Sequence, residues 1–163
     1  MAIASRSAHL KKPQRLLVPV DLSVLSYQAL DVALSLAGPR AKIRLFHASP
    51  SVHSAVAYGV DGAIVPVCDP VLSAAQVVYA KRVLTKKAVA FKRKLQVEAV
   101  ESSHAAQAIA QVARRFKADL IVMTTHGRGG LSRLLSGSEA QKLFHLYEGV
   151  ILMLRPKHQR GKR

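Results

Sequence analysis

Short apolar runs alternate with amphipathic stretches along most of the chain. The apolar runs predict five strands, at residues 15–20, 42–48, 95–100, 119–123 and 150–154. Apolar positions at helical spacing predict four helices between them, at residues 24–36, 73–94, 105–116 and 138–146. Strands and helices that alternate in this order belong to a parallel sheet covered on both faces. The pattern therefore predicts a doubly wound α/β fold.

One segment breaks this alternation. Residues 49–70 contain three prolines and two glycines and show no sustained hydrophobic period. Clusters of these two residue types mark turns and loops, so the sequence predicts a long loop there. Long loops inside compact domains often carry function.

The length and the cysteine content limit the class of protein. A chain of 163 residues fits one domain at ~100 to 200 residues per domain. We expect that domain to span residues 15–155, between a basic arm at 1–14 and a basic tail at 156–163. Cys68 is the only cysteine, which excludes an intrachain disulfide and favours a reducing, cytoplasmic location. No apolar run approaches the ~20 residues of a membrane span, and the histidines lack the paired spacing of a metal site.

The charge balance is strongly basic. Lys and Arg number 25 against nine acids, a formal net charge of +16, which favours anionic partners. The stretch from Lys81 to Lys94 carries seven cations and no acid. We hypothesise that this stretch and the two basic ends contact a polyanion such as nucleic acid, through phosphates rather than by stacking, because aromatic residues are few. A solvated face of an amphipathic helix would account for the same charges.

Two predicted loops are candidates for a ligand site. In open α/β sheets, ligands bind at the carboxyl ends of the strands. Asp21 and Ser23 follow the first strand, and residues 124–138 follow the fourth. The second loop is rich in glycine, and Ser138 opens a helix whose N-terminus favours an anion such as phosphate. The alternative is that the glycines only turn the chain and that Asp21 and Ser138 only cap helices.

The second loop also carries a recognisable spacing. Residues 124–138 resemble the nucleotide motif of the universal stress protein family, Gly-x2-Gly-x9-Gly-Ser/Thr, with nine residues between Gly127 and Gly137. Residues 17–23 resemble the first strand and aspartate of that family, and His47-Ala48 the end of its second strand. The resemblance implies a flavodoxin-like (Rossmann-like) sheet of five parallel strands in the order 3-2-1-4-5. It also implies a homodimer through the fifth strand, Val150 to Leu154, and, in one branch of the family, an ATP pocket.

The resemblance assigns roles to individual residues. It implies that Asp21 and Ala48 lie near the adenosine, Gly127 near the ribose and phosphates, and Gly137 with Ser138 at the distal phosphates. The complete implied nucleotide-binding set is Val20, Asp21, Ala48, Met123, Thr124, Thr125, His126, Gly127, Arg128, Gly130, Gly137, Ser138 and Glu139.

The sequence departs from the family pattern at two of these positions. Thr124 stands where the family has the first glycine of its motif, and its side chain would crowd a ligand. Glu139 stands where a small apolar residue is usual. A carboxylate beside phosphates is repulsive unless Mg²⁺ or Arg133 screens it.

These observations lead to one expected function and two alternatives. We expect a module that binds ATP or another adenine nucleotide, with or without Mg²⁺, and that has a regulatory role in a stress response with little or no turnover. No catalytic residue is predicted, because no general base is evident. The alternatives are a slow Mg²⁺-dependent ATPase and a nucleotide-free basic protein that contacts nucleic-acid phosphates.

Overall fold

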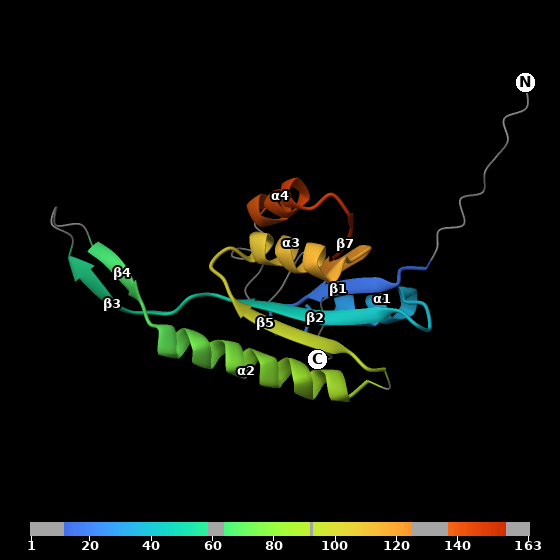
Figure 1. The fold of residues 1–163 in the computed structure, drawn as a ribbon, viewed down its shortest axis with the longest axis horizontal. Helices are drawn as coiled ribbons and strands as arrows, with labels where there is room; N and C mark the ends of the chain where they lie inside the picture. Colours follow the sequence, from blue (N-terminus) through green and yellow to red (C-terminus); the bar gives the residue numbers. More distant parts are fainter. Residues whose placement is uncertain (1–11, 59–63, 92, 125–136, 156–163) are drawn as a thin grey trace, which may run out of the picture.

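The computed structural model describes residues 12–58, 64–91, 93–124 and 137–155 (Figure 1). Five strands form one sheet in the order β5-β2-β1-β6-β7, and every neighbouring pair is parallel. Numbered along the chain within this sheet, the order is 3-2-1-4-5, which confirms the expected topology. The strands are β1 (Arg15–Pro19), β2 (Lys42–Ser49), β5 (Gln96–Glu101), β6 (Leu120–Thr124) and β7 (Val150–Leu154).

Helices cover both faces of the sheet, as the sequence predicts. Along β1, Leu16 and Val18 pack with α1 (Gln28–Leu36) and α2 (Pro70–Val89), whereas Leu17 packs with α3 (Ala105–Phe116). Successive side chains of a strand point to opposite faces, so one short strand contributes to both cores. In Figure 1, α3 and α4 (Gly137–Leu146) lie on one side of the sheet and α2 on the other.

The observed helix starts show which local interactions dominate. The start of α3 at Ala105 and its end at Phe116 match the predicted bounds. The predicted start of α2 at residue 73 is wrong: Asp69 accepts a hydrogen bond from the Leu72 amide at 2.9 Å, and Pro70 occupies the first helical position, where no amide hydrogen is needed.

The predicted start of α1 is also wrong, because the helix begins at Gln28 rather than near residue 24. The Ser26 hydroxyl donates to the Ser23 carbonyl at 2.8 Å, and the Ser23 hydroxyl accepts from the Ser26 amide at 3.2 Å. Such local side-chain bonds give the backbone an alternative to helix. Residues 22–27 therefore form a bend and turns before the helix.

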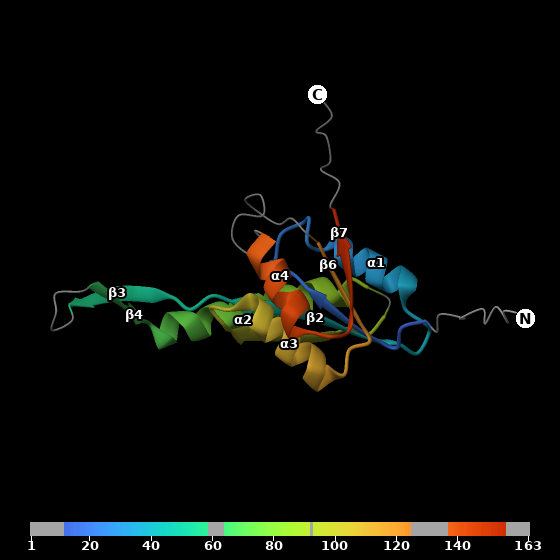
Figure 2. The ribbon, with the colours of Figure 1, turned by 90° about the horizontal axis from the view of Figure 1, so that it is seen from above.

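The predicted loop at residues 49–70 contains a β-hairpin, which corrects that prediction. Strands β3 (His53–Tyr58) and β4 (Ile64–Cys68) pair antiparallel and form a separate two-stranded sheet. In both Figure 1 and Figure 2 this hairpin projects away from the five-stranded sheet, beside the N-terminal end of α2. Among the described residues, no helix is long and apolar enough to cross a membrane.

Candidate functional site

The described part of the predicted site lies at the carboxyl edge of three adjacent strands. Val20 and Asp21 follow β1, Ala48 is the last residue but one of β2, and Met123 and Thr124 end β6. The amide of Val20 donates to the Phe46 carbonyl at 2.8 Å, which extends the β1–β2 pairing to this edge. Because β2 and β6 flank β1 on opposite sides, the strand order reverses here, where ligands bind in open α/β sheets.

Asp21 organises the turn between β1 and α1. Its Oδ1 atom accepts hydrogen bonds from the Ser23 amide at 3.0 Å and from the Ser23 hydroxyl at 2.6 Å. Leu22 between them adopts a φ of 65°, a conformation that non-glycine residues seldom take. The interpretation of Asp21 as a helix cap is wrong, because α1 begins at Gln28 and its N-cap residue is Tyr27, without a side-chain cap bond. Asp21 instead closes a local turn with Ser23. The same bonds hold the half-buried carboxylate in a fixed orientation at the edge of the sheet.

His47 is a residue of this edge that the sequence reasoning did not place in the site. Its Nδ1 atom lies 2.8 Å from the carbonyl oxygen of Val20. Because a carbonyl only accepts, Nδ1 carries the hydrogen, and in the neutral ring Nε2 is the acceptor. Burial lowers the pKa of His47, although the Val20 bond and the negative charge of Asp21 both act to raise it. The ring therefore fastens the end of β2 to the end of β1 in its neutral form.

Both residues that end β6 are buried. Met123 is buried in the core cluster with Leu17 and Phe46, so its side chain belongs to the packing beneath α3. Ala48 packs against the same cluster. Thr124 is also buried, at 6 % exposure. Its side chain occupies space at the end of the strand that a glycine would leave open.

The structure describes only some of the remaining predicted site residues. Thr125, His126, Gly127, Arg128 and Gly130 lie outside the described residues.

The other three, Gly137, Ser138 and Glu139, form the first turn of α4. A helix that connects two parallel strands runs back across the sheet, so the N-terminus of α4 faces the same carboxyl edge as Asp21. Fully buried Leu143 fixes α4 on α3, and the Tyr147 hydroxyl donates to the Ala118 carbonyl at 2.6 Å. The C-terminal half of α4 is thereby anchored in the fold, and its N-terminus offers the free amides that favour a phosphate.

The described residues offer few alternatives to this edge. They contain no group of three or more His, Cys, Asp or Glu side chains that could hold a metal. A hollow of about 400 Å³ lies between the C-terminal end of α2 and the start of β5, lined in part by Phe91, Lys94 and Leu95. It is at the opposite end of the strands from Asp21 and includes none of the predicted site residues.

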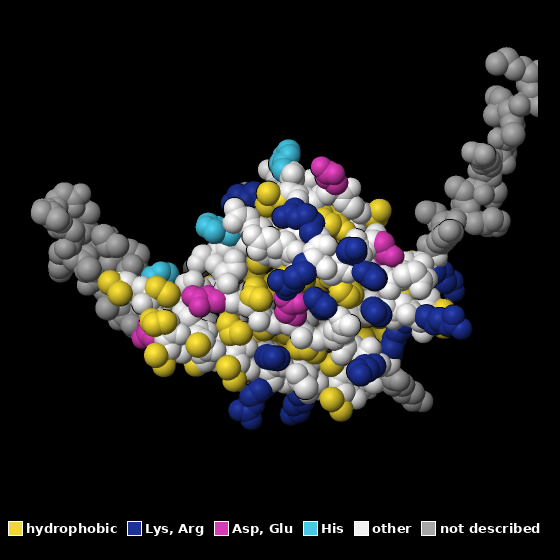
Figure 3. Space-filling model, viewed as in Figure 1, with side chains coloured by type: hydrophobic (Ala, Val, Ile, Leu, Met, Phe, Trp, Pro, Cys, Tyr) yellow, Lys and Arg dark blue, Asp and Glu magenta, His cyan; other side chains and the backbone are white. Residues whose placement is uncertain are grey.

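The basic stretch from Lys81 to Lys94 divides into two kinds of cation. Lys81, Arg82, Lys86 and Lys87 are exposed on α2. Arg93 instead uses its Nη2 atom to donate to the carbonyls of Gly38 at 2.6 Å and Ala41 at 2.5 Å. Figure 3 shows Lys and Arg side chains along the C-terminal half of α2 and over the neighbouring surface. Lys81, Arg82 and Lys86 are available to an anionic partner, whereas Lys87 lies over the Tyr27 ring at 5.0 Å and Arg93 closes the turn between α1 and β2. Lys92 lies outside the described residues.

Comparison with solved structures supports the fold. UspA from Lactobacillus plantarum is 22% identical, with 87% of this chain and 97% of that chain covered and a TM-score of 0.64. A universal stress protein family member from Burkholderia pseudomallei is 24% identical over 88% and 96% of the two chains, with a TM-score of 0.59. A universal stress protein crystallised in complex with cAMP is 19% identical over 90% and 99%, with a TM-score of 0.56.

The family itself follows from the sequence match. No curated protein matches the chain. The family model of the universal stress proteins matches residues 12–154, which include nearly all of the described residues. The strand order and the strand-end positions of Asp21 and Ala48 agree with that match. This chain is a member of the universal stress protein family.

Proposed function

We propose that this chain binds an adenine nucleotide, ATP foremost, at the carboxyl edge of β1, β2 and β6, and that it acts as a regulatory binding module in a stress response with little or no turnover. One observation carries the proposal. Val20–Asp21, Ala48 and Met123–Thr124 lie at the carboxyl ends of three adjacent strands, at the reversal of strand order. The right-handed connection from β6 to β7 supports a position for the first turn of α4 at the same edge.

The adenosine end of the proposed site is the better described. Ala48 has the smallest side chain that an L residue offers, which leaves room above the end of β2. Asp21, fixed by Ser23, places a carboxylate at the end of β1, where it can accept hydrogen bonds from a ribose hydroxyl. A family member of the same fold crystallised with cAMP, an adenine nucleotide, which supports this assignment.

The phosphate end of the proposed site rests on α4. The dipole and free amides of a helix N-terminus stabilise a nearby anion by about 0.3–1 kcal/mol. Glu139 in that first turn works against this, and we propose that Mg²⁺ screens it when a triphosphate is bound. Thr124 restricts the space at the end of β6. Together these two residues favour an adenine nucleotide bound mainly through its adenosine part.

Equilibrium dialysis of nucleic-acid-free protein against Mg²⁺-ATP tests the proposal, with GTP and tripolyphosphate as controls at low and raised salt. We expect the protein to bind ATP in preference to both controls. This ATP binding should persist at raised salt and should be lost in Gly137→Val. Asp21→Asn should weaken ATP binding, whereas Asp31→Asn, an identical charge change on the exposed face of α1, should not. Equal binding of all three anions, falling together with salt, would mean that charge alone attracts them.

A second candidate function is contact with a polyanion. Lys81, Arg82, Lys86 and Lys87 are exposed on one helix that contains no acid. We propose that they bind phosphates of nucleic acid together with the basic ends at 1–14 and 156–163, which lie outside or at the margin of the described residues. Removing a cation that binds one phosphate should reduce the slope of log affinity against log salt by about 1. Lys81→Ala with Lys86→Ala should therefore flatten the slope, whereas Gly137→Val should leave it unchanged.

We also propose that the chain forms a homodimer through β7 and acts in the cytoplasm. Strand β7 is an edge of the sheet, paired only with β6 among the described strands, and Val150 at its start is 64 % exposed. An exposed apolar edge strand is a template for pairing with another chain. Light scattering of Val150→Lys beside the wild type tests the dimer: the variant should have half the wild-type mass.

A further inference from the structure

The N-terminal half of α2 is apolar on two opposite faces. Ser73, Ala80 and Leu84 are buried on the inner face, and Leu84 packs in the core with the sheet. On the far side of the helix, Val71, Ala75, Val78 and Tyr79 recur at helical spacing and face outward. Val71 is 75 %, Val78 59 % and Tyr79 65 % exposed. Figure 3 shows these apolar side chains gathered over this end of the molecule, with few charges among them.

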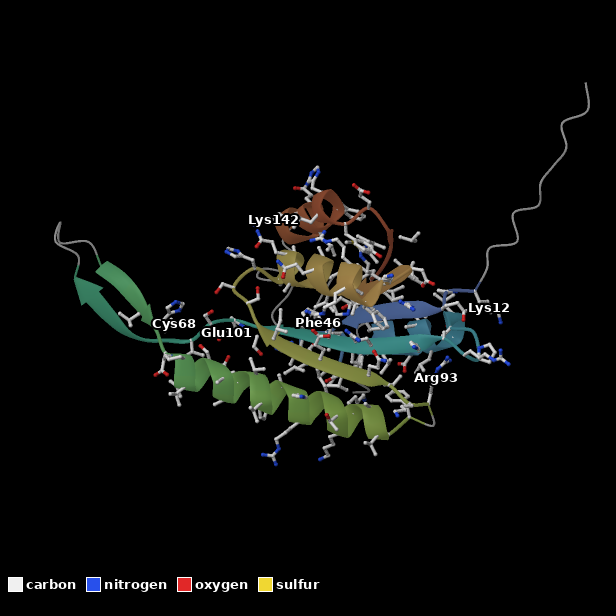
Figure 4. All side chains as sticks on the ribbon, in the orientation of Figure 1. Lys12, Phe46, Cys68, Arg93, Glu101 and Lys142 are labelled. Atoms are coloured by element: carbon white, nitrogen blue, oxygen red, sulfur yellow. The ribbon has the colours of Figure 1, made fainter. Side chains whose placement is uncertain are left out.

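The hairpin adjoins this apolar face. The Asp69 amide donates to the Val52 carbonyl at 2.7 Å, and the Val52 amide donates to the Ser73 hydroxyl at 2.9 Å, so the base of the hairpin is fastened to the first turn of α2. Figure 4 shows Cys68 at this junction, beside Glu101 and far from Arg93 at the other end of the helix. We name β3, β4 and the outward stripe Val71, Ala75, Val78 and Tyr79 the arm surface.

The arm surface lacks the support that a hairpin needs. Strands β3 and β4 pair only with each other in the described part of the chain. A two-stranded hairpin is at best marginally stable alone, and both of its strands present unpaired backbone groups. Apolar patches of more than a few hundred Å² are uncommon on monomers and mark interaction sites. We therefore expect a partner that covers the apolar stripe and supports the backbone of the hairpin.

The distribution of charge indicates which partner fits. The chain has 25 Lys and Arg residues, yet none lies between Arg44 and Lys81, a span that includes the whole arm surface. Two copies that each carry a net charge of +16 repel wherever their cations approach within about 10 Å. The arm surface is where a second copy can approach with least repulsion. A polyanion, by contrast, would be drawn to the C-terminal half of α2, where Arg82 and Lys86 replace the apolar stripe.

We propose that the arm surface is a self-association interface, in which the hairpin of one copy lies on the outward stripe of α2 of a second copy and the reverse contact forms about a twofold axis. A twofold interface requires such self-complementarity. The contact covers the outward stripe of both copies and leaves Arg82 and Lys86 at its rim. It is separate from the β7 edge, because α2 packs beside β5 at the other edge of the sheet.

The mass of the full chain in solution, measured by light scattering and analytical ultracentrifugation across micromolar concentrations, tests this interface. We expect Val78→Lys to halve the wild-type mass. Val89→Lys is the matched control: it makes the same change at a 79 % exposed position on the same helix, outside the arm surface, and should keep the wild-type mass. Far-ultraviolet circular dichroism shows that each variant is folded.

A spin label on Cys68, the only cysteine, gives a second readout. Pulsed electron resonance should detect an interlabel distance in Val150→Lys, which lacks the β7 contact, and no distance in the double variant Val78→Lys with Val150→Lys. A monomeric wild type, or a Val78→Lys variant with unchanged mass, overturns the proposal. So does a monomer that binds neutral phospholipid vesicles in a manner that Val78→Lys abolishes, because the occupant would then be lipid.

Discussion

Arg93 has a structural role, unlike the exposed cations of α2 that could bind phosphate. Its Nη2 atom donates to the carbonyls of Gly38 and Ala41, and more weakly to that of Pro39 at 3.3 Å. Gly38 and Ala41 are both buried. Removing the guanidinium takes this donor from both carbonyls, of which that of Gly38 keeps the Ala41 amide at 3.1 Å. Arg93 is itself only partly exposed.

The structure sets the size of the expected effect. A hydrogen bond to a charged group contributes about 1.5–3 kcal/mol, and one Nη2 atom has two hydrogens for its two short bonds. Solvent reaches part of the group, so we expect Arg93→Ala to lower the free energy of unfolding by about 2–3 kcal/mol in total. This corresponds to a fall in Tm of about 4–12 °C for a domain of this size. Lys81→Ala, an exposed change on the preceding helix, should stay within about 0.5 kcal/mol.

Urea denaturation followed by circular dichroism measures both variants. Arg93→Lys adds a test of geometry, because an ammonium keeps the charge but lacks the planar fork that spans two carbonyls. It should recover less than the full loss. The reverse order is expected for nucleic acid binding, where Lys81→Ala should matter and Arg93→Ala should not. A loss below about 0.5 kcal/mol in Arg93→Ala would refute the structural role, as would an equal loss in Lys81→Ala.

Three further predictions follow from individual side chains. Tyr147→Phe should cost about 1–2 kcal/mol of stability in urea, because it removes the donor to the Ala118 carbonyl in a partly buried position; no loss would show that water replaces the hydroxyl. Because burial lowers the pKa of His47 below its ordinary 6.5, the unfolded chain takes up a proton first as the pH falls. Stability should therefore decline below about pH 6.5, less steeply in His47→Gln, and parallel pH profiles would contradict this. Glu139→Ala should raise ATP affinity most when Mg²⁺ is absent, measured by dialysis with and without EDTA; equal gains in both would remove the screening role.

The parallel sheet could be predicted because each of its strands has a recognisable pattern within a few consecutive residues. Each strand is a short apolar run with a buried face on both sides, and the order of strands and helices then limits the topology to few choices. The bounds of α3 agree because Ala106, Ile109 and Ala113 repeat at helical spacing up to the left-handed Lys117. The convergence of Asp21, Ala48 and Thr124 at one edge follows from the same topology.

The elements that the sequence analysis predicted wrongly are those in which local signals compete. Three prolines and two glycines at residues 49–70 are typical of loops, yet they flank or interrupt two apolar segments that pair with each other as β3 and β4. At the start of α1, the hydroxyls of Ser23 and Ser26 bond to nearby backbone and delay the helix by four residues.

The roles of His47 and Arg93 could not have been found from sequence pattern at all. His47 meets Val20 across 27 residues, and Arg93 meets Ala41 across 52. Each contact exists only once the sheet has formed. A histidine at a strand end and an arginine in a basic run carry no signal that distinguishes them from their neighbours.

The proposed nucleotide site and the arm surface are adjacent along the chain, and this leads to a last prediction. Ala48 lies one residue before the end of β2, and the hairpin begins at His53. The connection is held at both sides, since the Ser103 hydroxyl donates to the Ser51 hydroxyl at 3.1 Å and Val52 bonds to Ser73. A nucleotide that orders the end of β2 therefore acts on the base of the hairpin.

If both proposals hold, nucleotide binding and self-association share a coupling free energy, and linkage makes the effect reciprocal. ATP should then shift the concentration at which the chain associates, and the ATP dissociation constant should change between protein concentrations below and above that point, by about fivefold or more for a typical coupling. Val78→Lys should hold the dissociation constant at the value of dilute wild type at every concentration. A constant that is the same for dilute wild type, concentrated wild type and Val78→Lys would show that the two surfaces act independently, because residues 49–52 would then transmit nothing between them.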